Sequence, residues 1–422
     1  MLALDTTARV LITAAAARAL AGAMAPPARV LVVAGPTAVG KSSAALRLCE
    51  ARDGELVSAD SVQLYRGLDV GSNKPSPAEL ERVRHHLVDV ADASNPWSAG
   101  AWCAAAAEAI GDVARRGKLP VVVGGTMMYA QWLVRGAPDA PKASATAAAS
   151  AQEFLAPYGD DWDKARNAVA GRSEACAARV AKLSQNDFYR LSRALEIELD
   201  REAGGGSAEA RRPVLGSDFD VRCAFLAPAD RTALYHAIDE RCDIMLARGL
   251  LEETANLRAT GRLPSSSTAA RAIGYRQALD YLEARVSGEA DASLESYVDF
   301  CRQFRTASRN YAAEQLKWYR RDATFAIVPA GDDAALATLL DLDRGAYDAF
   351  LSSDAQTAAR NDLAGDPKAM KTFASRPCAA EADPEAALAR AAAAVARFAE
   401  ADFVSGDDVR LAELRRRDGV GD

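Results

Sequence analysis

The sequence lacks the spacing patterns of a zinc site. It has seven cysteines but no Cys-x-x-Cys pair, and it has only three histidines, so no zinc-finger arrangement can be built from it. Scattered thiols without a secretory signal are typical of a protein from a reducing compartment. The cysteines are Cys49, Cys103, Cys176, Cys223, Cys242, Cys301 and Cys378.

Long apolar runs and internal repeats are also missing. No stretch reaches the roughly 18 apolar residues that a membrane-spanning helix needs. No internal repeat is found. With 422 residues, half of them apolar, the chain is long enough for more than one globular unit with a sizeable core.

The chain has no overall excess of basic residues, which by itself disfavours a nucleic-acid partner. Its 51 Lys and Arg stand against 58 Asp and Glu, but residues 331–422 hold 11 of the former and 18 of the latter. Residues 1–330 are therefore balanced, with 40 of each sign. A neutral body still binds nucleic acid if its basic residues cluster, as Arg179, Lys182, Arg190 and Arg193 do in the sequence.

The N-terminal segment, residues 1–28, is rich in Ala and poor in acids. An organellar transit peptide has this character, but the segment contains no serine, which counts against a plastid signal. A plain leader is the alternative. We therefore expect a cytoplasmic protein, with mitochondrion or plastid left open.

The strongest motif is Gly-Pro-Thr-Ala-Val-Gly-Lys-Ser at Gly35 to Ser42, which fits the phosphate-binding loop G-x-x-x-x-G-K-[ST]. An apolar run at 30–34 predicts a buried strand before it, and 43–50 predicts a helix after it. Backbone N–H groups of such a loop surround phosphate oxygens at the positive end of the helix. Lys41 adds a charge, and Ser42 is placed to bind Mg²⁺.

Asp60 follows a second predicted strand at 55–59. A carboxylate at the carboxyl end of a strand, beside a phosphate loop, lies where open α/β sheets bind ligands. Asp60 is then a candidate general base or Mg²⁺ partner. A turn or helix-capping residue is the alternative, and spacing alone favours it.

A third predicted strand, 120–124, ends in Gly124-Gly125-Thr126. An NTP hydrolase more often ends this strand in a carboxylate that handles metal and water. The glycines allow a backbone or a ligand to approach closely, and Thr126 offers a hydroxyl. The sequence therefore disfavours an ordinary ATPase or kinase.

Alternating strands and helices around a phosphate loop predict an α/β fold, with a P-loop NTPase-like parallel sheet flanked by helices. We expect the core at 29–140 and 214–330, with strands also at 220–226 and 323–328. Long helices are predicted near 230–248, 268–285 and 293–321. A helical insertion occupies 141–213, and an acidic, Ala-rich C-terminal extension of unknown function occupies 331–422.

The ordered motifs resemble those of the tRNA dimethylallyltransferases, also called tRNA isopentenyltransferases, and their wording is closest to plant and algal members of bacterial type. The resemblance covers roughly 29–330. Besides the phosphate loop, it rests on SADSVQLYRGLDVGSNKP from Ser58, HHLVDV from His85, GGTMMY from Gly124, RLSRALE from Arg190, RAIGYRQ from Arg271 and TASRNYAAEQLKWYR from Thr306.

The resemblance implies transfer of a dimethylallyl group from its diphosphate to N6 of the adenine 3′ to the tRNA anticodon. It implies that Asp60 takes or orients the N6 proton and that Thr126 lies near the acceptor and the phosphate. It also implies that Arg241 clamps the diphosphate, although a solvated helix arginine is the reading without the family. The implied diphosphate-binding residues are Gly35, Thr37, Ala38, Gly40, Lys41, Ser42 and Ser43, with Mg²⁺ as cofactor at Ser42.

RNA contacts are also implied by the resemblance. Sequence-specific RNA binding uses stacking and edge hydrogen bonds to unpaired bases, so Tyr65, Tyr275 and Trp318 are candidate stacking rings, with core packing as the alternative. Basic residues of 302–321 either track phosphates or form a solvated helix face. The implied tRNA-binding residues are Asp60, Ser61, Val62, Gln63, Tyr189, Arg190, Arg193, Arg271, Gly274, Tyr275 and Arg276.

Two departures from the family pattern stand out. Ala313 and Glu314 replace basic residues, and Met127 replaces a glycine. The alternatives are an isopentenyltransferase acting on free adenine nucleotides, a P-loop small-molecule kinase and a non-catalytic tRNA-binding relative. We expect tRNA and dimethylallyl diphosphate as partners of a monomer that is not bound to a membrane.

Overall fold

The structure is a computed structural model that describes residues 27–400, except 137–143, 160, 184, 205–213, 266 and 366–372. It divides into two compact units. The first contains the chain up to Val134 and from Val214 onwards, and the second is Arg135–Pro213. The leader expected at 1–28 lies almost entirely outside the described residues.

The first unit is built on a parallel sheet. Within the described residues, its strands lie in the order β3-β2-β4-β1-β5-β6. In the centre, Val32 of β1 lies opposite Val122 of β4 and Cys223 of β5. The strands are β1 (Ala28–Ala34), β2 (Gly54–Ser58), β3 (His85–His86), β4 (Leu119–Val123), β5 (Phe219–Ala227) and β6 (Ala326–Pro329).

Helices cover both faces of this sheet. The described helices of this unit are α2 (Lys41–Arg52), α3 (Pro77–Arg82), α4 (Ala99–Arg115), α5 (Met127–Arg135), α10 (Arg231–Ala247), α11 (Leu250–Ala259), α12 (Tyr275–Ser287), α13 (Leu294–Arg320), α14 (Asp333–Asp341), α15 (Arg344–Leu351), α16 (Asp354–Asp362), α18 (Ala379–Ala382) and α19 (Pro384–Ala399). A short 3₁₀ turn, Gly216–Asp218, precedes β5.

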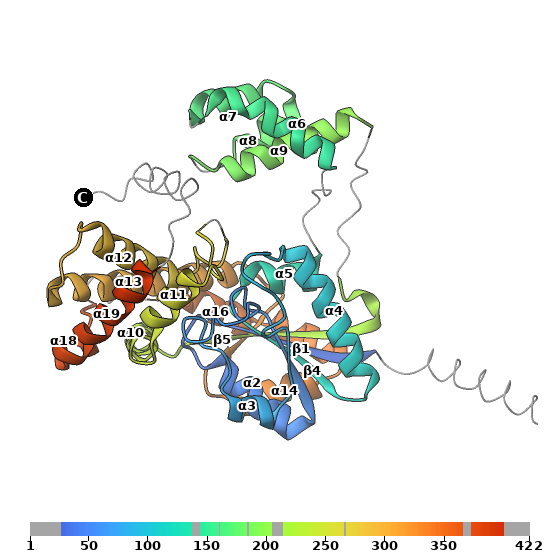
Figure 1. The fold of residues 1–422 in the computed structure, drawn as a ribbon. Helices are drawn as coiled ribbons and strands as arrows, with labels where there is room; N and C mark the ends of the chain where they lie inside the picture. The colour runs from blue at the N-terminus through green and yellow to red at the C-terminus, as the bar shows by residue number, and fades with distance from the viewer. Residues whose placement is uncertain are drawn as a thin grey trace, which may run out of the picture. The chain divides into compact units, whose positions relative to one another are not determined.

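The alternation of side chains along β1 separates two cores. Val30 and Val32 pack with helix α4 on one face of the sheet, and Leu31 and Val33 pack with α2 and α14 on the other. Figure 1 shows α4 and the α2–α14 pair on opposite sides of the strands. Because both faces are covered, the strands read as continuous apolar runs.

Most helix starts follow from local capping. Ser98, Asp230 and Ser293 accept backbone N–H groups at the first turns of α4, α10 and α13. Helix α2 differs, since it starts from Gly40 at φ 92° without a side-chain cap. Its first N–H groups are therefore left available to a ligand.

The second unit is a small helical bundle. Its core contains Trp162, Val169, Leu191 and Leu195. The hydroxyl of Ser144, at the start of the bundle, donates to Asp200 near its end at 2.6 Å. The elements are α6 (Ala145–Leu155), the 3₁₀ turn Ala156–Tyr158, α7 (Trp162–Ala170), α8 (Glu174–Val180) and α9 (Phe188–Glu202).

Much of the segment from 331 onwards packs into the first unit. Phe398, at the end of α19, is completely buried in the same core as the α11 and α12 side chains. The Arg305 guanidinium on α13 pairs with Asp243 and also donates to the carbonyls of Arg376 and Pro377. The C-terminal helices are thus part of the fold.

In the part of the chain that the structure describes, we find no helix both long and apolar enough to cross a membrane.

Candidate active site

Two of the three predicted catalytic residues, Asp60 and Arg241, line a cavity of about 130 Å³ at the carboxyl ends of β1, β2 and β4, whereas Thr126 is not among its lining residues. Each strand delivers one segment, as expected for an open parallel sheet. Helices α10 and α13 close the cavity. Among its lining residues are Thr37, Lys41, Ser42, Asp60, Gln63, Gly124, Gly125, Arg241, Tyr311 and Gln315.

The phosphate loop takes a shape that depends on its small residues. A Cβ on Gly35 would lie 2.9 Å from Val39 Cγ1 and 3.0 Å from the Leu226 carbonyl oxygen. Ala38 and Gly40 have φ of 63° and 92°, in the left-handed region. Ser42 and Ser43 are exposed in the first turn of α2. The path of the loop therefore depends on small residues at these positions.

Two cationic side chains, Lys41 and Arg241, line this cavity. Burial, together with the charge of Arg241, lowers the pKa of Lys41 to about 7, and the Asp60 charge only partly opposes this. Lys41 Nζ donates to the Pro36 carbonyl at 2.7 Å. Burial also lowers the pKa of Arg241. An anion in this cavity would stabilise both cations.

Arg241 is not a solvated helix residue. Its Nη1 donates to Thr37 Oγ1 at 2.6 Å, and its Nε is buried with no hydrogen-bond partner among the described residues. An orphaned buried N–H is costly, so this atom indicates a missing acceptor. A diphosphate oxygen would provide one.

Asp60 fits both interpretations made from the sequence. Its Oδ1 accepts the N–H groups of Val62 at 2.8 Å and Gln63 at 3.2 Å, so it does stabilise a turn. It also lines the cavity with Lys41 and Arg241. Since Oδ1 is occupied by the turn, Oδ2 is the oxygen left for chemistry.

Thr126 lies beside this turn. Its Oγ1 accepts the N–H of Ser61 at 3.1 Å, and its own N–H donates to the Ala59 carbonyl at 3.2 Å. Gly124 has no room for a side chain, because a Cβ would lie 2.1 Å from the Ala59 carbonyl oxygen. The Gly-Gly-Thr turn after β4 is therefore hydrogen-bonded to the residues on either side of Asp60.

Sequence reasoning missed two residues of α13 that reach the cavity. Gln315 is completely buried and bonds to both the phosphate loop and the β4 turn, and the Tyr311 hydroxyl donates to Gly125 O at 3.0 Å. A signal was present, since Gln315 falls on the buried stripe of Phe304, Ser308, Ala312 and Tyr319. A buried amide at such a position needs fixed partners.

The predicted tRNA-binding residues of the first unit are partly exposed. Ser61, Arg271 and Arg276 are exposed, and Val62 and Gln63 are half-buried. Gly274 is buried at φ 96°, where a Cβ would lie 3.2 Å from Phe304.

Two of the three candidate stacking rings are buried in the core. Tyr275 is completely buried with its hydroxyl donating to Glu253 at 2.6 Å, and Tyr65 is also buried. Of the two interpretations given for these rings, the structure therefore shows core packing, and neither ring is accessible to a base. Trp318 remains 39% exposed.

The basic residues of α13 fall into a buried pair and an exposed pair. Arg305 is buried against Asp243, and Arg309 is largely buried against Asp239. The prediction that these two arginines bind phosphates along the RNA backbone is therefore wrong, because both guanidinium groups are buried in ion pairs. Arg302 and Lys317 are exposed and pair within the helix with Asp299 and Glu314.

In the second unit, the predicted residues lie on α9. Tyr189 is 80% exposed, the most exposed of the large hydrophobic side chains that the structure describes, and Arg190 is exposed beside it. Arg193 is half-buried and pairs with Glu196. A solvent-exposed aromatic ring next to an arginine forms a surface on which an unpaired base can stack.

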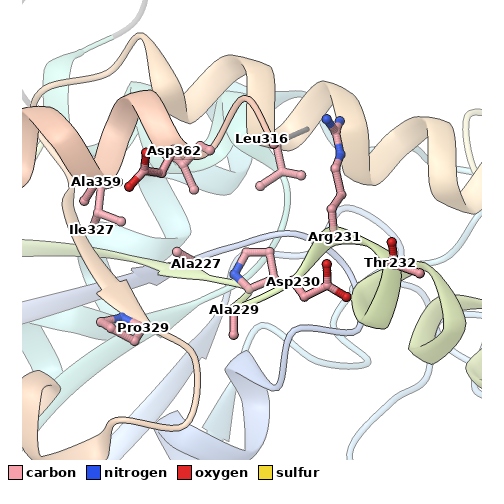
Figure 2. Close-up of a pocket in the computed structure, with 13 residues that line it drawn as sticks. Ala227, Ala229, Asp230, Arg231, Thr232, Leu316, Ile327, Pro329, Ala359 and Asp362 are labelled. Carbon is pink, nitrogen blue, oxygen red and sulfur yellow. The ribbon is translucent and has the colours of Figure 1, made fainter. Parts of the chain in front are cut away.

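A larger cavity, about 380 Å³, lies at the carboxyl ends of β5 and β6 (Figure 2). Asp230 and Arg231 at the start of α10 face Ala359 and Asp362 of α16 across it. Asp230 caps α10, and Arg231 donates to the Ala364 carbonyl at 2.9 Å. None of the predicted site residues lines this cavity, so we do not place the chemistry there.

The described residues contain no group of three or more His, Cys, Asp or Glu that could hold a metal ion. A Mg²⁺ ion bound mainly through substrate phosphates and water needs no such cage, and a serine at a helix start is enough protein ligation. The exposed Ser42 fits that mode.

Comparisons with known proteins agree with this geometry. Residues 63–322 match the family model described as IPP transferase. The chain is 37% identical over 324 residues to tRNA dimethylallyltransferase 9 of Arabidopsis thaliana, covering 69% of each chain. It is 38% identical over 295 residues to the tRNA dimethylallyltransferase of Thiobacillus denitrificans, covering 70% of this chain and 89% of the relative.

Among solved structures, the full-length tRNA isopentenylpyrophosphate transferase of Bacillus halodurans matches with a TM-score of 0.52 and 26% identity, covering 80% of this chain and 99% of that one. The predicted α/β fold with a parallel, P-loop NTPase-like sheet is confirmed.

Proposed function

Because the chain belongs to the IPP transferase family, whose relatives are named tRNA dimethylallyltransferases, we propose that it transfers a dimethylallyl group from dimethylallyl diphosphate to N6 of the adenine 3′ to the anticodon in tRNA. The C1–O bond of the donor breaks, the N6–C1 bond forms, N6 loses a proton and diphosphate leaves with the electron pair. The observation that carries this proposal is one cavity in which a phosphate loop faces Asp60 and Arg241.

We assign binding of the diphosphate leaving group to the phosphate loop. The residues are Gly35, Thr37, Ala38, Gly40, Lys41, Ser42 and Ser43. Lys41 and Arg241 supply positive charge where negative charge develops as the C1–O bond breaks. The unpaired Arg241 Nε and the lowered pKa of Lys41 support this role, because both would be relieved by an anion. No nucleotide hydrolysis is required.

We propose Mg²⁺ as the cofactor, held by Ser42 together with diphosphate oxygens and water. Bound there, it would neutralise charge on the leaving group. The available hydroxyl at an uncapped helix start supports this assignment.

At the acceptor end, we assign Asp60 Oδ2 to take or orient the N6 proton and Thr126 to hold the Asp60 segment. General-base action of this kind contributes about 10²–10⁴-fold to rate. The division of labour between the two carboxylate oxygens supports the assignment, since Oδ1 keeps the turn while Oδ2 is left for the substrate.

For tRNA binding, we propose three segments: Asp60 to Gln63, Arg271 to Arg276, and Tyr189 to Arg193 on α9. The adenine must leave its stack to expose N6. The exposed Tyr189 and Arg190 support a role for the helical insertion. Slower hydrogen exchange at Phe188–Glu202 on adding an anticodon stem-loop tests this assignment, and unchanged exchange would reject it.

The activity is tested by incubating the protein with Mg²⁺, labelled dimethylallyl diphosphate and either an unmodified anticodon stem-loop or AMP. Label entering only the stem-loop supports the proposal. Label entering AMP would indicate a nucleotide isopentenyltransferase. If label enters neither acceptor, the proposed reaction is rejected.

A further inference from the structure

Gln315 joins two loops that carry different parts of the site. Its Oε1 accepts the backbone N–H of Thr37 at 2.9 Å, and its Nε2 donates to the backbone carbonyl of Gly125 at 2.8 Å. These partners fix the orientation of the amide, because one loop offers only a donor and the other only an acceptor. Gln315 is completely buried, so water does not compete for either bond.

Tyr311 lies one helical turn before Gln315 on α13 and bonds to the same carbonyl. Its hydroxyl donates to Gly125 O at 3.0 Å. The approach is close enough that a Cβ on Gly125 would lie 2.5 Å from Gln315 Nε2. One carbonyl therefore anchors the β4 turn to α13 through two side chains.

The two joined loops hold opposite ends of the proposed reaction. Thr37 belongs to the phosphate loop, and its hydroxyl accepts from Arg241 at 2.6 Å. Gly125 precedes Thr126, whose hydroxyl accepts the N–H of Ser61 next to Asp60. Gln315 is thus the side chain through which α13 spans from the leaving-group loop to the general-base turn.

We propose that Gln315 is a positioning residue that sets the separation between the diphosphate loop and the Thr126–Asp60 turn, with Tyr311 as its support. This inference rests on the proposed function. Displacement at C1 requires N6, C1 and the leaving oxygen to be aligned, and small misplacements lower the rate steeply. A buried amide with both ends engaged holds such a separation better than apolar packing does.

The test replaces Gln315 by Met, which has similar volume and neither hydrogen bond. We expect Gln315→Met to lower kcat about tenfold to hundredfold, the loss expected for two buried hydrogen bonds, and to weaken binding of inorganic pyrophosphate by up to about tenfold. Affinity for the stem-loop should stay within about twofold. The matched control is Gln303→Met, the same change at an exposed position of the same helix, which should leave all three unchanged.

A purely structural role predicts another pattern. If Gln315→Met lowers the melting temperature while kcat and pyrophosphate affinity of the folded protein stay at wild-type values, the proposal is overturned. Gln315→Glu is the second variant. When its carboxyl group is ionised, it keeps the acceptor for Thr37 and has no donor for Gly125, so kcat relative to wild type should be at least tenfold lower at a pH that ionises the carboxyl group, and wild-type turnover there would again overturn the proposal.

A double-mutant cycle with Tyr311→Phe tests the shared anchor. Tyr311→Phe alone should lower kcat only a few-fold, because Gln315 still holds the carbonyl. The double variant should lose more than the product of the two single effects. Effects that simply multiply would reject the shared anchor. Pyrophosphate binding is measured without tRNA. It therefore reports on the geometry of the two loops even if the wild-type protein prenylates neither the stem-loop nor AMP.

Discussion

Asp60 shows how one side chain carries two duties. One carboxylate oxygen stabilises the turn after β2, and the other is left for the substrate. Removing the whole carboxylate would mix a folding effect with a chemical one. The informative change keeps the turn and removes only the charge.

Asp60→Asn does this, because the amide oxygen still accepts from Val62 and Gln63. We expect kcat to fall about 10²–10⁴-fold, with stem-loop and pyrophosphate affinity changed less than about threefold. Single-turnover transfer from labelled donor measures the rate. A variant with full turnover would remove Asp60 from the mechanism.

Lys41 provides a pH-dependent signature. Its pKa of about 7 in the ligand-free protein should rise when pyrophosphate binds, because an anion favours the ammonium form. Binding should therefore take up close to one proton at about pH 8.5 and much less near pH 6, where Lys41 is already charged. Titration calorimetry in buffers of different ionisation enthalpy measures this uptake.

The control is Lys41→Met, which removes the protein's share and leaves the titration of pyrophosphate itself. Equal uptake by both proteins at high pH would contradict the prediction. The same lowered pKa means that the ligand-free fold gains stability as pH rises from about 7 towards 10.5, because only the unfolded chain still holds the proton in that range.

At the residue scale, the sequence motifs and the family resemblance together named three charged groups that lie at one site, and their roles there stay predictions. Lys41, Asp60 and Arg241 line one cavity with the phosphate loop, although they are far apart in sequence. Gln315 lies within the TASRNYAAEQLKWYR block, but it was missed because its partners are backbone atoms of two distant loops, which the block does not reveal. The sequence left Tyr275 open between stacking and core packing, because burial depends on neighbours that a motif does not reveal.

At the scale of elements, one carboxylate holds the loop between β2 and β3. Glu253 on α11 accepts the N–H groups of Asp69, Val70 and Gly71 at 2.8–3.1 Å, as well as the Tyr275 hydroxyl. Gly71 must be a glycine, since a Cβ there would lie 2.6 Å from Tyr275. Residues Asp69 to Gly71, which follow Asp60 in the same loop, are thus connected through Glu253 to Tyr275 in the Arg271–Arg276 segment.

Glu253→Ala should release this loop. Losing charge-assisted bonds to three backbone donors should lower stability by about 2–3 kcal/mol and weaken stem-loop binding, while pyrophosphate binding persists on the separate phosphate loop. Hydrogen exchange at Asp69–Gly71 and stem-loop titration measure the effect. Tyr275→Phe removes one bond and should have a clearly smaller effect, and unchanged exchange in Glu253→Ala would contradict the prediction.

Elements with strong local signals were predicted closely, and those without were not. The expected strands at 30–34 and 120–124 correspond to β1 and β4, and the expected helix at 293–321 to α13. The helix expected from 268 begins only at Tyr275, because Gly274 adopts positive φ. Strand β3 has two residues and exists through pairing with β2, which no local pattern reveals.

At the scale of the whole molecule, the C-terminal extension is the largest surprise. Composition described 331–422 as acidic and rich in Ala, with no identifiable role. The structure instead places α14 on α2 and buries Phe398 in the core. Sequence alone could not show this, because Ala-rich helices are compatible with either a packed or a free segment.

Phe398→Ala should therefore destabilise the whole first unit by about 3–5 kcal/mol, seen as a lower melting temperature and lower midpoint in denaturant. Phe350→Ala is the matched control, since Phe350 on α15 is 36% exposed and its loss should cost less than about 1 kcal/mol. Equal effects of the two changes would contradict the placement of α19.

The burial of α19 has a genetic consequence. A stop codon or frameshift between residues 331 and 375 leaves every residue of the active-site cavity encoded, yet it deletes side chains that close the core and the carbonyls that receive Arg305. The truncated chain would expose that core to cellular proteases. Such alleles should behave as nulls through loss of protein, and screens for mild alleles should instead recover missense changes on exposed faces.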